Sequence, residues 1–352
     1  MKVAALLIVM LSNDGYWISG TDGQLIATWA ADAAAVPCDL HWELKLGQTR
    51  LGGDKAPIGP GQSATVSITC PDVRTRLTLR WDWRLVRKQD GQQLESGSEK
   101  IIAYPANLTR GWQELVRGKR ILLLDPISGL PAILKQAKVP FVEVNDAAAL
   151  QRASADIIII GPDALTIALF EQAPLQALAQ SGVAVAVLRQ SKVSHVLGFE
   201  LRARLPADAL HWPTDAPLLR GLDAEDLHRW EQAWKRAQPD LLLALRVPNR
   251  ELSEALVTWP VGAQGGALPA ALHPEAVDGL LLSTSGRVKG GRLVLCQMPL
   301  NPWLTDPRSQ IFLGNLLDSL VAPPLSIATA ELPTAQGARR PSAITISPGD
   351  AR

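Results

Sequence analysis

The segment LLRGLDAEDLHRW (residues 218–230) concentrates side chains that could carry out acid–base chemistry on a sugar. Asp223, Glu225 and Asp226 place three carboxylates within four residues, and a histidine and a tryptophan follow. Glycosidases use two carboxyl groups that flank the scissile bond, one of them as general acid. The same residue types are also typical of the first turn of a helix, where carboxylates bind free backbone N–H groups. The pattern therefore allows a catalytic and a structural interpretation.

The local spacing favours the structural interpretation. Asp223 fits the N-cap position, and Asp226, three residues later, fits the reciprocal position of a capping box. Leu222 and Leu227 stand at the two positions of a hydrophobic staple. We therefore expect a helix to begin after Asp223, and no catalytic residue is assigned to this segment.

A serine hydrolase site is the second chemical possibility. Residues 183–188 (VAVAVL) form a buried apolar run of the kind that precedes a nucleophile on a sharp turn. Ser191 lies in the turn that follows, with Ser194 and His195 close behind, but the turn has neither a cysteine nor a GxSxG motif. A loop serine near a histidine is common by chance, so these three residues are kept only as an alternative. Cys296 lies in an apolar strand segment, where a thiol is normally inert.

The sequence predicts no metal or cofactor site. The five histidines form no HxH or HExxH pattern, and the three cysteines form no CxxC pair. The glycine-rich segments 262–268 and 286–292 match neither the P-loop nor the GxGxxG fingerprint, so both are interpreted as turns. Cys38 and Cys70 are either a bridged pair within one sandwich or two buried thiols.

Tryptophan is unusually frequent, with eleven residues against two tyrosines and four phenylalanines. Indole faces can stack on pyranose rings, but indoles also fill hydrophobic cores, and the core interpretation is favoured. Trp17, Trp212 and Trp303 are the candidates for sugar contact, on condition that their rings are exposed.

Residues 1–105 alternate between apolar and polar side chains with the period of two that half-buried strands require. The clearest run is RLTLRWDWRLV (76–86), in which leucines and tryptophans occupy one face. LHWELKL and ATVSITC repeat the pattern, and turn-rich segments separate the runs. Several short antiparallel strands in this length predict an immunoglobulin-like β-sandwich. Residues 1–11 fit its first strand or a poor signal peptide.

Residues 106–118 are interpreted as a linker, after which the pattern changes. Continuous apolar runs at 121–125, 155–162 and 183–188 predict strands that are buried on both faces, with helical segments between them. Such alternation is typical of a doubly wound parallel sheet, which residues 119–322 are predicted to form.

The C-terminal part of the chain carries three further predictions. DGLLLSTSGRVKGGRLVLCQMPL (278–300) predicts a β-hairpin, because strand-like runs flank a Gly-Gly pair. DPRSQIFLGNLLDSLV (306–321) predicts an amphipathic closing helix with a proline in its first turn. Residues 323–352 contain few large apolar side chains and are predicted to be a disordered tail.

The charge distribution excludes some partners. The net charge is +1, and acids and bases are spread evenly, so no basic stripe is available for nucleic acid. No apolar segment is long enough to span a bilayer. We therefore expect neither a nucleic-acid partner nor a membrane span.

Three consecutive segments, LLRGLDAEDLHRW, GRLVLCQMPL and TDPRSQIFLGNLLDSL, resemble the C-terminal part of bacterial family-2 glycoside hydrolases of the β-galactosidase and β-glucuronidase type. The segments LHWELKLGQTRLGGDKAPIGPGQ and SEKIIAYP fit the same layout, so the resemblance covers most of residues 12–322. It implies an immunoglobulin-like sandwich followed by a class I glutamine amidotransferase-like domain with a flavodoxin-like fold. Such relatives are often exported, which favours a periplasmic or secreted location over the cytoplasm.

Two departures limit what the resemblance implies about activity. The jelly roll and the catalytic barrel that precede this region in such enzymes have no counterpart here, so no catalytic glutamate is carried over. An amidotransferase would need a nucleophilic cysteine on the elbow and a downstream His-Glu pair, and neither is in place. We therefore expect a non-catalytic accessory or interaction region whose partner is a catalytic glycosidase, a second copy of the chain or a carbohydrate. The alternatives are a carbohydrate-binding module and a hydrolase built on Ser191, Ser194 and His195.

Overall fold

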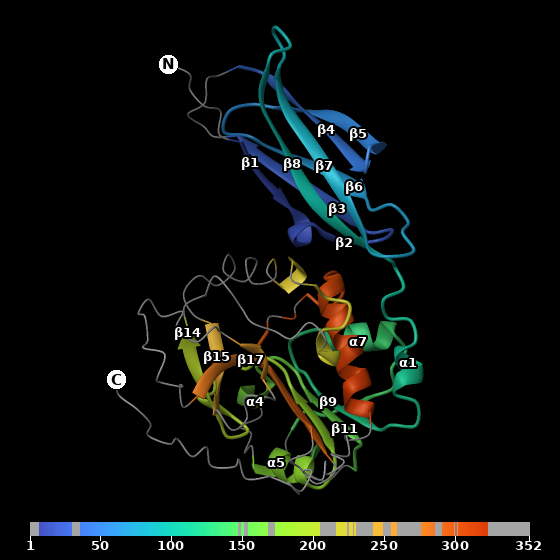
Figure 1. Cartoon of the computed structure of the whole chain (residues 1–352), viewed down its shortest axis with the longest axis vertical. Helices are drawn as coiled ribbons and strands as arrows, with labels where there is room; N and C mark the ends of the chain where they lie inside the picture. Colours follow the sequence, from blue (N-terminus) through green and yellow to red (C-terminus); the bar gives the residue numbers. More distant parts are fainter. Residues whose placement is uncertain are drawn as a thin grey trace, which may run out of the picture.

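The structure is a computed structural model that shows two lobes, with the N-terminal strands in one lobe and the C-terminal strands and helices in the other (Figure 1). It describes residues 7–29, 36–146, 149–150, 154–167, 173–204, 216–223, 225–227, 229, 242–248, 255–258, 276–285, 291–298, 300 and 302–322. We call residues 7–104 the sandwich and residues 112–321 the α/β unit. The predicted tail 323–352 and the glycine-rich segment 262–268 lie outside the described residues.

The sandwich consists of two sheets that enclose one core. One sheet has the order β1-β3-β6, with β1 (Leu7–Leu11), β3 (Asp22–Trp29) and β6 (Ser63–Thr69). The other has the order β2-β8-β7-β4-β5, with β2 (Tyr16–Ile18), β8 (Gln93–Tyr104), β7 (Leu77–Arg87), β4 (Cys38–Leu46) and β5 (Thr49–Ile58). A short 3₁₀ turn, Ser12–Gly15, connects β1 to β2.

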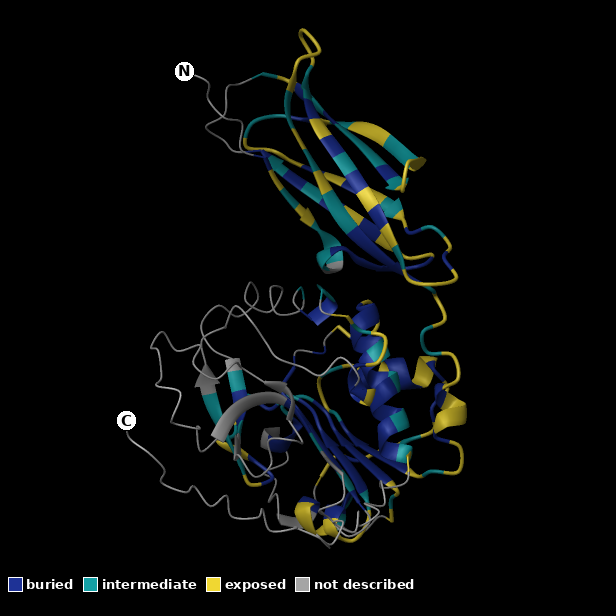
Figure 2. Ribbon diagram, viewed as in Figure 1, coloured by how far each residue is buried: buried dark blue, intermediate teal, exposed yellow. Residues whose placement is uncertain are grey.

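The alternating pattern of the sequence is confirmed in the sandwich core. Along β7, Leu79, Trp81, Trp83 and Leu85 are buried, and the polar residues between them are exposed or half-buried. The same alternation runs along β3 and β6 (Figure 2). A sheet with one face on the core and the other exposed to solvent buries every second side chain. The thiols of Cys38 and Cys70, whose pairing the sequence left open, are free and buried.

The α/β unit is built on a mixed sheet whose first half is parallel. Its parallel strands have the spatial order β10-β9-β11-β12-β18, with β9 (Ile121–Leu124), β10 (Val142–Glu143), β11 (Ile157–Ile160), β12 (Ala184–Val187) and β18 (Arg292–Cys296). Antiparallel strands extend the sheet beyond β18, namely β17 (Ala276–Ser285), β16 (Ala255–Thr258), β15 (Leu242–Pro248), β14 (Phe199–Arg204) and β13 (His195–Val196). The predicted hairpin is confirmed, because β17 pairs antiparallel with β18.

Helices cover both faces of the parallel strands. The helices are α1 (Trp112–Leu115), α2 (Leu130–Gln136), α4 (Ala164–Ile167), α5 (Ala173–Gln180) and α7 (Pro307–Val321), with a 3₁₀ turn at Pro217–Leu219. Alternate residues of β9, β11 and β12 contribute to two separate apolar clusters. One cluster includes α1, α2 and α7, and the other includes α4 and α5. Because both faces are covered, β9, β11 and β12 are buried along their whole length, as Figure 2 shows.

Two details refine the predictions. The predicted linker contains α1, and its Trp112 packs in the core of the α/β unit, so the free connection is shorter than 106–118. The closing helix is confirmed as α7, which Asp306 caps by accepting a hydrogen bond from the Arg308 backbone N–H. None of the helices in the described part of the chain combines the length and apolar composition that crossing a membrane needs.

Gly23 of β3 tests the packing of the sandwich core. A Cβ atom at Gly23 would lie 2.1 Å from the indole of Trp17, which is itself buried. We expect Gly23→Ala to lower the free energy of unfolding by about 2 kcal/mol, because the core has no room for a methyl group. The measurement is urea denaturation. Gly52→Ala is the matched control, since a Cβ there meets no atom within 4 Å; equal stability of the two variants would contradict this packing.

Candidate functional site

The carboxyl ends of the parallel strands are the first place to look for a site, because open α/β sheets bind ligands at that edge. The chain places Asp125 directly after β9, Gly161 and Asp163 after β11, and Gln190 and Ser191 after β12. These residues come from neighbouring strands and lie at one edge of the sheet.

Asp125 organises the loop between β9 and α2. Its carboxylate accepts hydrogen bonds from the backbone N–H groups of Ser128 (3.0 Å) and Leu130 (2.9 Å) and from the Ser128 hydroxyl (2.7 Å). A Cβ atom at Gly161 would lie 2.3 Å from an Asp125 carboxylate oxygen, so only glycine fits there. The Ser128 hydroxyl also accepts a hydrogen bond from the Trp303 indole at 3.2 Å. The carboxylate therefore holds a loop and the start of a helix.

The buried amide of Gln190 connects the loops that follow β11, β12 and β18. Its Oε1 accepts from the Leu165 N–H (3.1 Å), and its Nε2 donates to the carbonyls of Gly161 (2.9 Å) and Leu188 (2.6 Å). The Gln190 N–H donates to the side-chain carbonyl of Gln297 at 3.2 Å. A fully hydrogen-bonded buried amide fixes these loops relative to one another.

The alternative hydrolase residues form two separate pairs. The Ser191 hydroxyl donates to Asp163 Oδ1 at 2.8 Å, and the Ser191 N–H donates to the same oxygen. Ser194 Oγ and His195 Nδ1 are 3.1 Å apart on an exposed segment. Among the described residues, no hydrogen bond joins Ser191 to His195. A serine nucleophile needs a base that takes its proton, and in turn a group that orients the base; the described residues do not provide this arrangement.

The thiols and the possible metal ligands offer no chemistry at this edge. Burial raises the pKa of the Cys296 thiol to about 12, so the thiolate that would act as a nucleophile is not formed at neutral pH. Within the described ranges, no three His, Cys, Asp or Glu side chains converge to hold a metal ion.

The structure contradicts the predicted sugar contact at two of the three tryptophans. Trp17 is 1% exposed and Trp303 is 2% exposed, so neither ring can stack on a sugar. Trp17 packs edge-on against Trp81, with ring centroids 5.7 Å apart, and its indole donates to the Ser12 carbonyl. Both indoles are core side chains with a hydrogen-bonded N–H. Trp212 lies outside the described residues.

The acidic segment that opens at residue 218 forms the helix start predicted from its spacing. The Asp226 N–H donates to Asp223 Oδ1, and the Asp223 N–H donates to Asp226 Oδ2, each at 3.0 Å. This reciprocal pair is a capping box. Leu227 is buried in the core of the α/β unit, and Leu222 packs against the same cluster, as a staple requires.

The same carboxylates also bind the sandwich, which the sequence pattern did not indicate. Asp226 is fully buried, and its Oδ1 accepts from Arg76 at 2.9 Å. Its Oδ2 accepts from the Tyr104 hydroxyl at 3.3 Å, while Arg76 also pairs with Asp223 at 2.7 Å and donates to Tyr104 at 3.0 Å. Burial raises the pKa of Tyr104 above its usual range, so its hydroxyl remains a donor.

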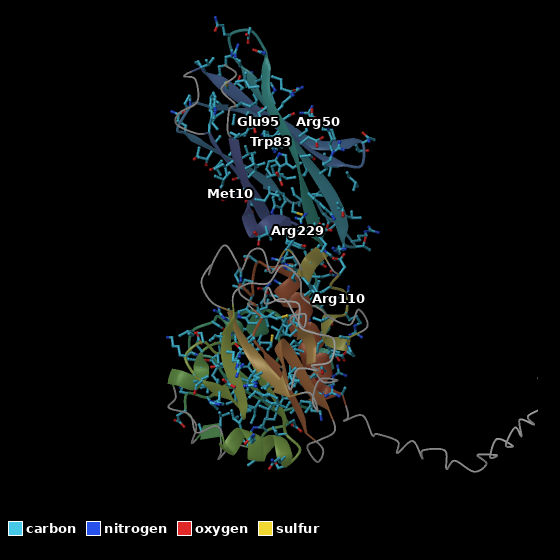
Figure 3. All side chains as sticks on the ribbon, turned by 60° about the vertical axis from the view of Figure 1, so that its left-hand side comes forward. Met10, Arg50, Trp83, Glu95, Arg110 and Arg229 are labelled. Atoms are coloured by element: carbon cyan, nitrogen blue, oxygen red, sulfur yellow. The ribbon has the colours of Figure 1, made fainter. Side chains whose placement is uncertain are left out.

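Glu225 and Arg229 extend the contact between the two lobes. Lys100 of β8 pairs with Glu225, which also pairs with Arg229 at 3.0 Å. Arg229 donates to the backbone carbonyls of Asp14 (3.3 Å) and Lys100 (3.2 Å), and Figure 3 shows it at the junction of the lobes. The helix start is therefore bound to the sandwich along its first turns.

Arg308 supplies a second buried charge at this junction. Its guanidinium is bound at two points by Asp306, with Nε–Oδ1 and Nη2–Oδ2 distances of 3.0 and 2.8 Å. The guanidinium lies 3.9 Å from the centre of the Tyr16 ring and 3.8 Å from Asp14 Oδ2, both in the sandwich.

We call the whole set of contacts between the sandwich and the α/β unit the inter-unit cluster. Its members are Asp14, Tyr16, Arg76, Lys100 and Tyr104 from the sandwich, and Asp223, Glu225, Asp226, Arg229, Asp306 and Arg308 from the α/β unit.

The cluster pairs its cations with anions, and several of its side chains are buried, which indicates a structural role. The sequence could not reveal it, since Arg76 and Asp226 are 150 residues apart. The only sequence signal was the density of acids in the segment, and the capping box accounted for that density by itself.

Comparisons with known proteins assign the chain to no family. No family model and no curated protein matches it. A calcium-binding mutant of β-glucuronidase 2 from Bacteroides uniformis covers 52% of this chain and 33% of its own, at 10% identity and a TM-score of 0.21. A protein described as a β-galactosidase from Bacteroides fragilis covers 67% of this chain and 45% of its own, at 8% identity and a TM-score of 0.21. A domain of the outer membrane lipoprotein Omp28 from Porphyromonas gingivalis covers 29% of this chain and 98% of its own, at 7% identity and a TM-score of 0.23. TM-scores of this size do not establish a shared fold.

Asp226 and Asp223 should differ sharply in their importance for stability. Asp226→Ala removes a fully buried carboxylate and leaves Arg76 and Tyr104 without their buried partner, so we expect a loss of about 3 kcal/mol in unfolding free energy. The Asp223 side chain is 49% exposed, so Asp223→Ala should cost about 1 kcal/mol, the usual value of an N-cap.

Urea denaturation measures both losses, with Glu114→Ala as the control. Glu114 of α1 forms an exposed ion pair with Arg117, which follows the helix, so its removal should change stability by less than about 0.5 kcal/mol. An Asp226→Ala variant as stable as Glu114→Ala would contradict the role of the cluster.

The inter-unit cluster should also weaken in acid. The Lys100 ammonium, hydrogen-bonded to Glu225, holds the pKa of the Glu225 carboxyl below its ordinary value of 4.5. Burial raises the pKa of Asp223, but the Asp226 N–H and Arg76 outweigh burial, and the pKa lies below the ordinary 3.8. A lowered folded-state pKa stabilises the fold above the unfolded-state value, and this stability is lost as the pH falls through the folded-state pKa.

We therefore expect Glu225→Gln to destabilise the chain at pH 7 and to converge with the unmodified chain as the pH falls below 4.5. Urea titrations at a series of pH values measure the difference, and Glu114→Gln is the control. A difference that stays constant down to pH 3, well below that ordinary value, would show that ionisation of Glu225 does not contribute.

Proposed function

We propose that this chain is a non-catalytic accessory region of a carbohydrate-active enzyme, which packs against a catalytic glycosidase subunit or domain. The resemblance of three segments to family-2 glycoside hydrolases supports the carbohydrate context. The parallel strands of the α/β unit, numbered along the chain, have the spatial order 2-1-3-4-5. This order is typical of flavodoxin-like domains and supports the amidotransferase-like assignment of residues 119–322.

The observation that carries the proposal is that the polar side chains Asp125, Gln190 and Ser191, at the carboxyl edge of the parallel sheet, are hydrogen-bonded within the protein. Asp125 holds a loop and a helix start, Gln190 links three loops, and the Ser191 hydroxyl donates to Asp163. A catalytic group needs free hydrogen-bonding capacity toward the substrate. At this edge that capacity is used within the protein, which favours a role in assembly over a role in hydrolysis.

The inter-unit cluster suits a role in assembly. Buried ion pairs fix orientation because each charge tolerates only one arrangement of its partners. The cluster holds the sandwich and the α/β unit through Asp226 and Arg308, which are both buried. A catalytic glycosidase would therefore bind one preformed surface that both lobes contribute to. A second copy of the chain is the alternative partner for such a surface.

Assays with aryl-β-galactoside and aryl-β-glucuronide test the proposal directly. We expect the purified chain to release no aryl alcohol above the buffer rate, because the described residues hold no pair of catalytic carboxylates or nucleophile and base. An active family-2 glycosidase in the same buffer is the positive control. Turnover that follows the protein through successive chromatographic steps would overturn the proposal.

A fluorophosphonate probe separates the proposal from the hydrolase alternative. We expect no covalent labelling, since the Ser191 hydroxyl is bound to Asp163 and the described residues place no histidine against it. Labelling that disappears in Ser191→Ala or Ser194→Ala, and persists in the control Ser98→Ala on the sandwich, would establish a serine hydrolase instead.

A further inference from the structure

An open groove of about 630 Å³ lies over strands β5, β4, β7 and β8 of the sandwich. Its lining includes four lysine or arginine residues, three carboxylates and a histidine. Arg50, at one side of the groove, is labelled in Figure 3 on the sandwich lobe. A concave surface with this many polar groups is a possible ligand site, and the charge balance inside it decides which ligand fits.

The carboxylates of the groove already have partners within the protein. Lys45 lies 2.7 Å from Glu43 and 2.9 Å from Asp82, so one ammonium bridges two acids that face each other on β4 and β7. Arg80 also pairs with Asp82 at 2.9 Å. The Asp54 carboxylate accepts the next backbone N–H at 2.8 Å. Each acidic side chain of the groove therefore has a hydrogen-bonding or charged partner within the protein.

The cations of the neighbouring row are not neutralised in the same way. Lys55, His41 and Arg84 lie directly opposite one another on β5, β4 and β7, and the row contains no acid. Within the described residues, Arg84 forms no ion pair or hydrogen bond, and its charge acts on Glu43, whose pKa is lowered mainly by its hydrogen bond with Lys45. Lys55 is 4.0 Å from Asp39, but Lys88 lies closer to that carboxylate, at 3.1 Å. Lys55 and Arg84 therefore lie on either side of His41, each one inter-strand spacing away, and an anion bound over this row would contact both cations.

We infer that this groove binds an anionic oligosaccharide, with its carboxylates facing Lys55, His41 and Arg84. An arginine guanidinium can bind a carboxylate through two parallel hydrogen bonds. Two inter-strand spacings separate Lys55 from Arg84, about 10 Å, so a short chain of uronate rings can reach all three side chains. The negative charge of the ligand follows from the groove, whereas the choice of a saccharide rests on the proposed function.

Isothermal titration calorimetry of the full chain tests the inference, with trigalacturonate as the anionic probe and maltotriose as the neutral one. We expect trigalacturonate to bind, maltotriose not to bind, and added salt to weaken the binding. Arg84→Ala should raise the Kd about tenfold, as expected for one charge-assisted hydrogen-bonding partner. Lys55→Ala should act in the same direction. Arg74→Ala, an exposed arginine of the sandwich outside the groove lining, should leave the Kd unchanged.

The results of these titrations distinguish failure of the anion-binding inference from failure of the proposed accessory function. Failure of trigalacturonate to bind, or an equal loss of affinity in Arg74→Ala, would overturn the inference and leave the non-catalytic accessory role standing. Triglutamate binding as tightly as trigalacturonate would overturn the assignment to a saccharide, and it would remove support for the carbohydrate context while the anion site remained. Circular dichroism of each variant confirms folding, and Arg84→Glu provides a second variant with a stronger expected loss.

Discussion

A carboxylate that leaves water needs charged and hydrogen-bonding partners, and Asp226 obtains them from both lobes of the chain. Its own helix start provides the Asp223 N–H, and the sandwich provides Arg76 and Tyr104. An apolar interface would tolerate small rotations of the lobes, whereas this carboxylate would lose a partner under any of them. The relative orientation of the sandwich and the α/β unit thus depends on this buried charge, together with the buried charge of Arg308.

Helix α7 connects this junction with the core of the α/β unit. Its N-terminal turn carries Arg308, a cation at the end of the helix where the dipole disfavours positive charge. Asp306, which caps the helix, neutralises Arg308, and Tyr16 of the sandwich covers it. One and two turns further along α7, Phe312 and Leu316 pack in the apolar cluster of the α/β unit. One helix therefore belongs both to the junction and to the core.

The sequence predicted those features that depend on neighbours in the chain. The alternation in residues 76–86 depends only on burying one face of β7, and the capping box of Asp223 and Asp226 closes within three residues. Features that depend on distant residues were not predictable in this way. The partner of Asp226 is 150 residues away, and the row in the groove appears only when β5, β4 and β7 are in register. The prediction that Trp17 and Trp303 contact sugar was wrong, because the composition of a chain does not show which side chains are exposed to solvent.

The double use of the Asp226 carboxylate links two events that are usually independent. It satisfies a free backbone N–H at a helix terminus, and it is the counter-ion of the opposite lobe. Separating the lobes would remove Arg76 and Tyr104 from the carboxylate that also caps the helix start, so both sets of contacts depend on one side chain. Local helix order and lobe docking are therefore thermodynamically coupled, and the two lobes are expected to gain and lose structure as a single cooperative unit.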